Sequence, residues 1–138
     1  MNWAATFKVG VTVVGGGIGY LFGGWTGLLP ILLVLMCIDQ VSGLLASYFE
    51  GKLSSKVGFN GISKKVMVLF IIMVCHFIDQ VCKNQGIYSG AVVRDGAIIF
   101  YLANEILSFI ENAGRMGIPL PSGLVNAVAI LKGKGEGK

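Results

Sequence analysis

The stretch LVLMCIDQVSG, residues 33–43, places an aspartate and a glutamine inside a long apolar run. The same tetrapeptide, IDQV, recurs forty positions later in LFIIMVCHFIDQVCK, residues 69–83, and each copy follows a strongly apolar run. About 20 consecutive apolar residues can cross the hydrocarbon core of a membrane as a helix. A charged side chain within such a run is costly, so each aspartate needs a specific environment. The stretch therefore indicates membrane helices that carry functional polar positions.

The composition of the whole chain also indicates a membrane protein. Of its 138 residues, 54% are hydrophobic and only 13% are charged, and the mean hydropathy is +0.77. Soluble domains usually carry about a quarter charged residues, roughly twice the fraction found in this chain. We therefore expect an all-α integral membrane protein. Its spans use most of the chain, which leaves no room for a separate catalytic domain.

Apolar runs of sufficient length occur four times, so we expect about four membrane-spanning helices. Trp3 and Trp25 bracket the first run, and Trp is enriched at both membrane–water interfaces. The fourth run carries Arg94, Asp95 and Glu105, and a charged group at a helix centre costs about 2.5–3.5 kcal/mol. A span is still favoured there, because the basic tail would otherwise end outside the cell. The expected spans are residues 7–24, 28–49, 66–82 and 91–110.

Lysines between the second and third spans set the expected orientation. Residues 50–65 form a basic loop in this prediction, and short loops rich in Lys and Arg are cytoplasmic. With an even number of spans, the N-terminus and the C-terminus also lie in the cytoplasm. Residues 1–111 then form the membrane region, and residues 112–138 form a cytoplasmic tail with a short apolar segment and a disordered basic end. The lysines of the basic loop are Lys52, Lys56, Lys64 and Lys65.

Three glycines in the first run follow a tandem Gly-x-x-x-Gly spacing. Gly15, Gly19 and Gly23 would share one face of a helix, and such faces let two membrane helices approach closely. The partner is either another helix of the same chain or a second copy of the protein, and the sequence leaves both open. Gly43 lies on a comparable small or polar face of the second span, together with Asp39.

Polar side chains recur at helical spacing in the second and fourth spans. A polar face inside a membrane either lines an aqueous path or packs within a helix bundle, because an unpaired charge is unstable in lipid. Asp39 lies near the middle of the second span, and a longer polar stripe follows the fourth. The candidates for a pore or bundle-interior position are Asp39, Arg94, Glu105 and Asn112.

Asp79 shares its tetrapeptide with Asp39 but lies one turn from the end of the third span. Lys83 follows four residues later, a spacing at which opposite charges pair on a helix. We therefore expect Asp79 to be an interfacial anchor rather than a deeply buried group.

The chain offers no recognisable catalytic or metal-binding motif. Cys37, Cys75 and Cys82 lie in or next to apolar runs and are typical of small hydrophobic residues there. His76 and the cysteines do not follow the spacing of zinc ligands. We expect no enzyme activity, no metal, no cofactor and no nucleic-acid partner.

Three segments together resemble the phage-lysis and toxin-secretion holins of bacteria and their phages. They are CIDQVSGLLASYFEGKLSSKVGFNGISKKV, CHFID and FYLANEILSFIENAGRMGIPLP, and they cover roughly residues 36–121. The resemblance implies a small multi-pass protein of the bacterial cytoplasmic membrane, or of the host cell membrane if a phage encodes it. Such a protein self-associates in the lipid bilayer as a homo-oligomer and opens lesions. A cell-wall hydrolase (endolysin) or a toxin that lacks a signal peptide leaves through them.

Two other classes of function stay open at this stage. One is a non-lytic membrane protein, either an antiholin or a scaffold subunit of an export or lysis complex. The other is a small ion channel or transporter that would use Asp39 and Glu105 as titrating or ion-binding groups. The size of what crosses the membrane distinguishes the three: folded proteins for a holin, ions or small solutes for a channel, and nothing for a scaffold.

Overall fold

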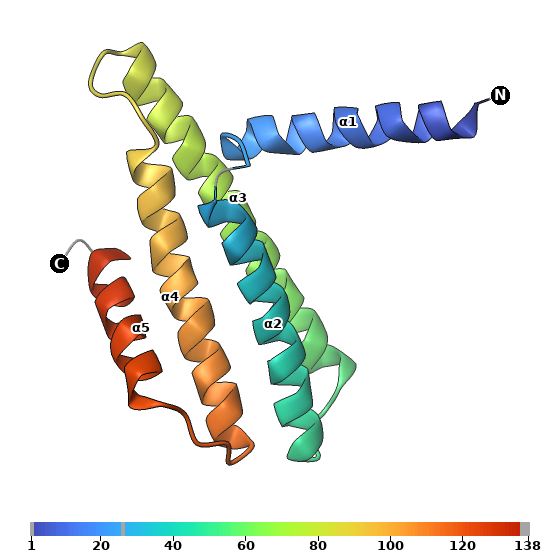
Figure 1. Cartoon of the computed structure of the whole chain (residues 1–138), viewed down its shortest axis with the longest axis vertical. Coiled ribbons are helices and arrows are strands. Elements are labelled where there is room, and N and C mark those ends of the chain that lie inside the picture. The colour runs from blue at the N-terminus through green and yellow to red at the C-terminus, as the bar shows by residue number, and fades with distance from the viewer. Residues whose placement is uncertain (1, 26, 136–138) are drawn as a thin grey trace.

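The computed structural model describes residues 2–25 and 27–135, and this part of the chain is helical with no strand (Figure 1). The expected all-α fold is therefore confirmed for the described residues. Five helices follow one another along the chain. They are α1 (Trp3–Phe22), α2 (Leu28–Phe49), α3 (Ser55–Asn84), α4 (Val92–Arg115) and α5 (Ser122–Gly135).

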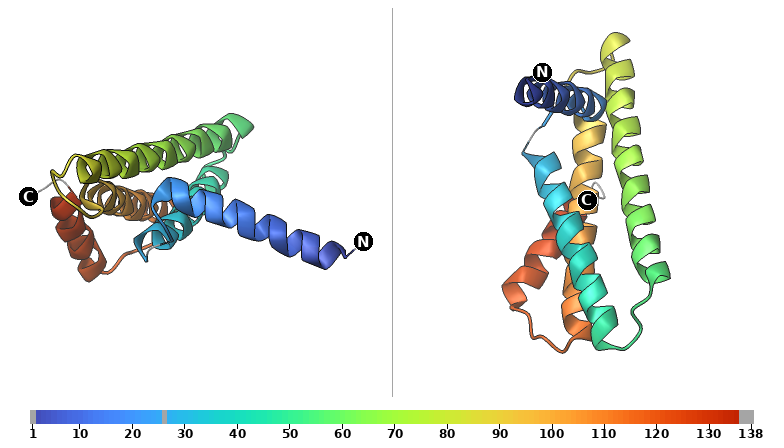
Figure 2. Two further views of the ribbon diagram at one scale, coloured as in Figure 1. Left: turned by 90° about the horizontal axis from the view of Figure 1, so that it is seen from above. Right: turned by 90° about the vertical axis from the view of Figure 1, so that its right-hand side faces the viewer.

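Helices α2, α3 and α4 run side by side and form the bundle that positions the polar residues (Figures 1 and 2). The most extensive contact in the bundle is between α2 and α4. Helix α5 folds back and packs along α4, whereas α1 lies crosswise to the bundle at the end where α2 begins. Polar side chains between α2, α3 and α4, namely Asp39, Lys65, Glu105 and Asn112, form what we call the polar seam of the bundle, and α1 projects sideways.

An apolar core fills the interior of the bundle, and along α4 it lies between Arg94 and Glu105. In a membrane, helices associate through van der Waals contact and hydrogen bonds rather than through the hydrophobic effect. Large aliphatic side chains such as Ile31, Val34 and Val74 are exposed on the outside, as a lipid-facing surface requires. The apolar core consists of Phe22, Leu29, Leu32, Met36, Ile72, Ile98 and Leu102.

Among the described residues, three helices are long and apolar enough to cross a membrane: α1, α2 and α3. Length and composition thus support three of the four expected spans. Helix α4 covers the expected fourth span but does not meet these criteria, because charged residues interrupt its apolar run. A crossing by α4 and the side of each terminus remain predictions.

The expected basic loop of residues 50–65 is wrong beyond Ser54. Helix α3 begins at Ser55, where the Ser54 hydroxyl accepts a 3.2 Å hydrogen bond from the Val57 N–H. A serine that caps the first turn stabilises a helix start. Lys56, Lys64 and Lys65 therefore lie on α3, and of the four lysines only Lys52 is in the connection.

The expected tail also differs from the structure. Helix α4 continues to Arg115, so a boundary after residue 111 would cut through it. The short apolar segment expected in the tail is part of α5, which lies against α4 and includes the first four residues of the basic end, 132–135. These four residues are helical rather than disordered, because they continue a helix that is already packed. Residues 136–138 lie outside the described part.

Candidate functional site

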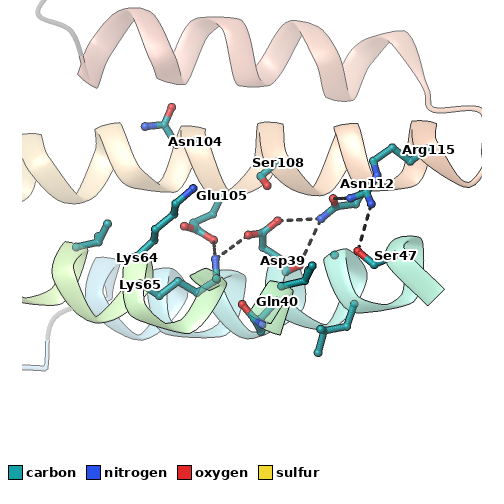
Figure 3. Close-up of a pocket in the computed structure, with 15 residues that line it drawn as sticks. Asp39, Gln40, Ser47, Lys64, Lys65, Asn104, Glu105, Ser108, Asn112 and Arg115 are labelled. Atoms are coloured by element: carbon teal, nitrogen blue, oxygen red, sulfur yellow. Dashed lines mark hydrogen bonds and ion pairs between the residues drawn. The ribbon is translucent and has the colours of Figure 1, made fainter. Parts of the chain in front are cut away.

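The ammonium group of Lys65 joins three helices at the centre of the polar seam (Figure 3). Its Nζ atom lies 2.6 Å from Oδ2 of Asp39 on α2 and 2.6 Å from Oε2 of Glu105 on α4. The three side chains are only 16%, 12% and 10% exposed, so this arrangement is largely shielded from solvent. One lysine thus faces two carboxylates, and each carboxylate comes from a different helix.

Asn112 extends this network along α4. Its side-chain amide donates a 3.1 Å hydrogen bond to Oδ1 of Asp39 and a 2.9 Å hydrogen bond to the hydroxyl of Ser42. Both carboxylate oxygens of Asp39 are therefore engaged. A Cβ atom at Gly43 would lie 3.5 Å from the Asn112 amide nitrogen, an ordinary contact distance. Gly43 accordingly lies beside this network without being sterically required there.

Arg115 closes the network at the end of the bundle opposite α1. Its guanidinium donates to both oxygens of Glu50, at 3.1 and 2.9 Å, and to the Ser47 hydroxyl at 3.2 Å. The hydrogen bonds from Arg115 lower the pKa of the Glu50 carboxyl below its usual value. This pair fastens the last turn of α2 to the last turn of α4.

A cavity of about 360 Å³ runs alongside the network. A space of this size with polar groups in its lining has room for several hydrogen-bonded waters. Lys64 also borders it and reaches from α3 toward α4 in Figure 3. Because Asp39 lies near the middle of α2, the polar space reaches half-way along that helix. Its remaining polar lining includes Gln40, Asn104 and Ser108.

A second polar cluster lies at the end of the bundle next to α1, and it corrects the expectation for Asp79. This residue is 1% exposed, so its carboxylate is buried between helices and is not an exposed anchor. Its carboxylate accepts hydrogen bonds from the Tyr88 hydroxyl at 2.5 Å and from the backbone N–H groups of Val93 and Arg94, both at 2.9 Å. No ion pair with Lys83 forms in the described structure. The unpaired N–H groups of the α4 N-terminus attract the carboxylate more effectively than an exposed lysine.

The side chain of Arg94 connects α4 to the C-terminal end of α1. Its Nη1 atom donates to the backbone oxygens of Phe22 and Gly23, at 3.1 and 2.8 Å, while its other nitrogens pair with Asp95. Gly23 has a left-handed φ of 79°, and a Cβ there would lie 2.5 Å from His76 Nδ1 and 2.6 Å from Arg94 Nη1. Only glycine fits this junction without displacing its neighbours.

The three glycines of the tandem spacing do not form one continuous packing face. Gly23 ends α1 as its C-cap. Trp25 packs against Gly19, where a Cβ would lie 2.9 Å from the indole nitrogen, and its indole N–H donates to the Gly15 carbonyl at 3.1 Å, but a Cβ at Gly15 would meet no atom within 4 Å. Within the protomer, the partner of Gly19 is therefore the Trp25 side chain from the turn after α1.

The structure thus brings together three of the four candidate polar residues and adds partners that the sequence pattern did not indicate. Asp39, Glu105 and Asn112 meet in one network, whereas Arg94 belongs to the cluster at the other end. Lys65 is among the residues expected in the basic loop, and its place in this network was not predicted from the sequence. Its position directly before an apolar run is the one signal that it could face a membrane interior.

Among the residues that the structure describes, no group of three or more His, Cys, Asp or Glu side chains is placed to hold a metal ion. The seam instead offers charged groups that neutralise one another between helices. If the helices separate, these charged groups form a hydrophilic surface that faces the space between the helices.

A family model described as the bacteriophage holin family matches residues 16–133, which include all of α2, α3 and α4. The chain belongs to the bacteriophage holin family. The resemblance of the sequence motifs to holins is thereby confirmed. Together with the three apolar helices, membership makes the chain a holin-like membrane protein, and it suggests a non-enzymatic one.

Similar proteins come from several bacteria. Uncharacterized protein BH0965 of Halalkalibacterium halodurans is 42% identical over 94% of this chain and 96% of its own length. Uncharacterized protein Lin0175 of Listeria innocua is 41% identical over 92% of this chain and 87% of its own. An uncharacterized 14.9 kDa protein in the nagH 3' region of Clostridium perfringens is 31% identical over 92% and 93%. No solved structure matches this holin-family chain.

Proposed function

We propose that this holin-family protein forms homo-oligomers in the bacterial cytoplasmic membrane and opens lesions there. An endolysin, or a toxin without a signal peptide, would leave the cytoplasm through these lesions. The observation that carries the proposal is the buried network in which Lys65 neutralises Asp39 and Glu105 between three helices. Family membership supports the same function.

The network explains how one sequence tolerates both a closed and an open state. In a single protomer, the carboxylates of Asp39 and Glu105 are paired and shielded from lipid. An unpaired charge at a helix centre would cost about 2.5–3.5 kcal/mol. In a crowded assembly, the same residues can line a water-filled space, where water replaces the ammonium group as their partner. Accumulation of protein therefore shifts the balance toward the open state.

Helix α3 is the element that we expect to move. The contact between α2 and α4 is the most extensive in the bundle, whereas α3 packs less extensively against α4 and least against α2. Across this seam, α3 is held by Lys65 and by a 3.3 Å hydrogen bond from the Gln40 amide to the Gly58 carbonyl. Displacement of α3 breaks these bonds and opens the polar faces of α2 and α4 to water.

The proposal is tested by inducing the protein in a bacterium that also contains a folded cytosolic reporter enzyme without an export signal. We expect abrupt loss of the membrane potential together with release of the reporter. Loss of potential without release would indicate a small channel. If neither occurs at confirmed membrane expression, an antiholin or scaffold function replaces the proposal.

Two neutral variants test the role of the network in the same assay. Asp39→Asn and Glu105→Gln remove the charges that Lys65 holds, so the time of release should change. Glu111→Gln is the matched control, because Glu111 is an exposed carboxylate on the same helix as Glu105. Release at unchanged times in both network variants would rule out the polar seam as the element that controls opening.

A further inference from the structure

Among the residues that the structure describes, two polar side-chain interactions join α2 to α3. One is the ion pair between Asp39 and Lys65, and the other is the 3.3 Å hydrogen bond from the Gln40 amide to the Gly58 carbonyl. Because α3 packs least against α2, few other interactions support this side of the bundle. The glutamine of the first IDQV copy therefore has a role of its own beside the charged network (Figure 3).

Gln40 reaches α3 because Gly61 has no side chain. A Cβ atom at Gly61 would lie 2.5 Å from Oε1 and 3.2 Å from Nε2 of Gln40, so the amide group occupies the space that a side chain would take. The backbone of Gly61 is helical and has no left-handed φ. Alanine therefore suits the backbone at this position. Its methyl group would displace the end of the Gln40 side chain and break the bond to Gly58.

Gly58 lies one turn before Gly61 and makes no such demand on its surroundings. A Cβ atom there would lie 3.6 Å from Cδ2 of Leu44, an ordinary contact distance. Gln40 binds the backbone carbonyl of this residue, which an alanine would retain. Alanine at either glycine favours the helix, but only alanine at Gly61 displaces Gln40.

The contact of Gln40 with Gly58 and Gly61, here called the Gln40 contact, borders the cavity beside the polar seam. Gln40 and Gly61 both line this cavity. As the helices separate, water that enters can replace the Gly58 carbonyl as the partner of the Gln40 amide. An amide exposed to lipid finds no replacement partner and loses several kcal/mol of favourable interaction. The Gln40 contact thus favours the closed bundle until water fills the seam.

We propose that Gln40 and Gly61 set how readily α3 leaves α2 when the protein opens. Gln40 holds the first third of α3 through a neutral hydrogen bond, whereas Lys65 holds the same helix through charge. Loss of the Gln40 contact weakens the closed state and leaves no charge unpaired. This inference rests on the proposed opening and identifies residues that set its threshold.

Alanine at each glycine tests this role in the reporter-release assay. The measured quantity is the amount of membrane-inserted protein at which release begins. Gly61→Ala should require a several-fold lower amount than the wild type, because one net hydrogen bond changes an equilibrium constant by about two- to tenfold. Gly58→Ala should not lower the amount. Equal amounts for the two glycine variants would overturn the proposal.

Removal of Gln40 tests whether Gly61 acts through it. Gln40→Ala should also lower the amount needed for release, and Gly61→Ala added to it should lower it no further, because the displaced amide is already absent. Additive effects of the two substitutions would overturn the proposal. Gln80→Ala is the control for loss of a glutamine, since Gln80 is the exposed glutamine of the second IDQV copy. Release from this control at the same lowered amount would also overturn it.

Unfolding in detergent separates this inference from the proposed function, because it requires no lesion. Gly58→Ala should raise the midpoint of unfolding equally with and without Gln40, since alanine favours a helix. Gly61→Ala should raise it only in the Gln40→Ala protein. Equal shifts of Gly61→Ala in both backgrounds would overturn the Gln40 contact even if the wild type releases the reporter. Unequal shifts in a protein that releases nothing would retain the contact and reject the lesion.

Discussion

The carboxylate of Asp79 on α3 accepts a 2.9 Å hydrogen bond from the backbone N–H of Arg94 in the first turn of α4. The residue at the N-cap of α4 is Ala91, which provides no side-chain cap. Asp79 supplies the missing acceptor from another helix, so it fixes the start of α4 against the end of α3. The same Arg94 then holds α1, which connects three helices at this end of the molecule.

Replacement of Asp79 by alanine should destabilise the bundle. The first N–H groups of α4 would lose their acceptor, and loss of a helix cap typically costs about 0.5–2 kcal/mol. Asp79→Asn keeps one acceptor oxygen and should lose less. The free energy of unfolding in detergent micelles measures both, with Gln80→Ala on the exposed neighbour as control. Equal stability of Asp79→Ala and Gln80→Ala would contradict the cap.

Tyr88 should ionise at unusually high pH. Its hydroxyl donates to the Asp79 carboxylate, and this hydrogen bond raises the pKa of Tyr88 above its usual value of 10.0. A pKa raised on folding means that the stabilisation is complete below about pH 10 and is lost as the pH rises through the folded-state pKa. The difference between the phenolate absorbance titrations of the wild type and Tyr88→Phe isolates this group. A difference curve centred at the ordinary tyrosine pKa would disprove the bond, and Asp79→Asn should shift the curve toward that value.

Replacement of Lys65 by methionine should be strongly destabilising. It leaves Asp39 and Glu105 buried without a cation, and removal of one partner from a buried ion pair costs about 3–5 kcal/mol. Lys64→Met is the control, because Lys64 is exposed and forms no ion pair with a described residue. The free energy of unfolding in detergent, measured from the loss of helix content, should be clearly lower for Lys65→Met than for Lys64→Met.

Neutralisation of the two acids should restore the stability of the Lys65→Met protein. With Asp39→Asn and Glu105→Gln added, no uncompensated charge remains in the seam. The triple variant should therefore unfold closer to the wild type than Lys65→Met alone. If the added substitutions lower the stability further, the loss in Lys65→Met arises from packing and not from charge.

Alanine at Gly23 should disturb the junction between α1 and the bundle. The position has a left-handed φ and no space beside His76 and Arg94. A non-glycine residue in such a conformation costs about 1–3 kcal/mol. Gly16→Ala is the matched control, because no atom lies within 4 Å of a Cβ there and alanine favours a helix interior. Gly23→Ala should lower the midpoint of thermal unfolding, whereas Gly16→Ala should leave it unchanged or raise it.

Prediction from the sequence was most accurate where a single property, such as a long apolar run, decides the local structure. The predicted span of residues 28–49 coincides with α2, because a long and predominantly apolar run favours a membrane helix whatever its neighbours are. The start of α3 was misplaced because the lysines and glycines of residues 55–65 are typical of a loop in isolation. These residues are helical because Ser54 caps the first turn and because the absence of a side chain at Gly61 makes room for Gln40 from α2.

The sequence by itself determined that this is a helical membrane protein of the holin family, because composition, run length and local motifs are properties of the chain alone. Tertiary structure decided what its repeated tetrapeptide does. Asp39 meets Lys65, 26 residues further along the chain, whereas Asp79 meets the N-terminus of α4. Identical local sequence thus gives an ion pair in one place and a helix cap in the other. The partner of a buried charge is set by which helices pack against it.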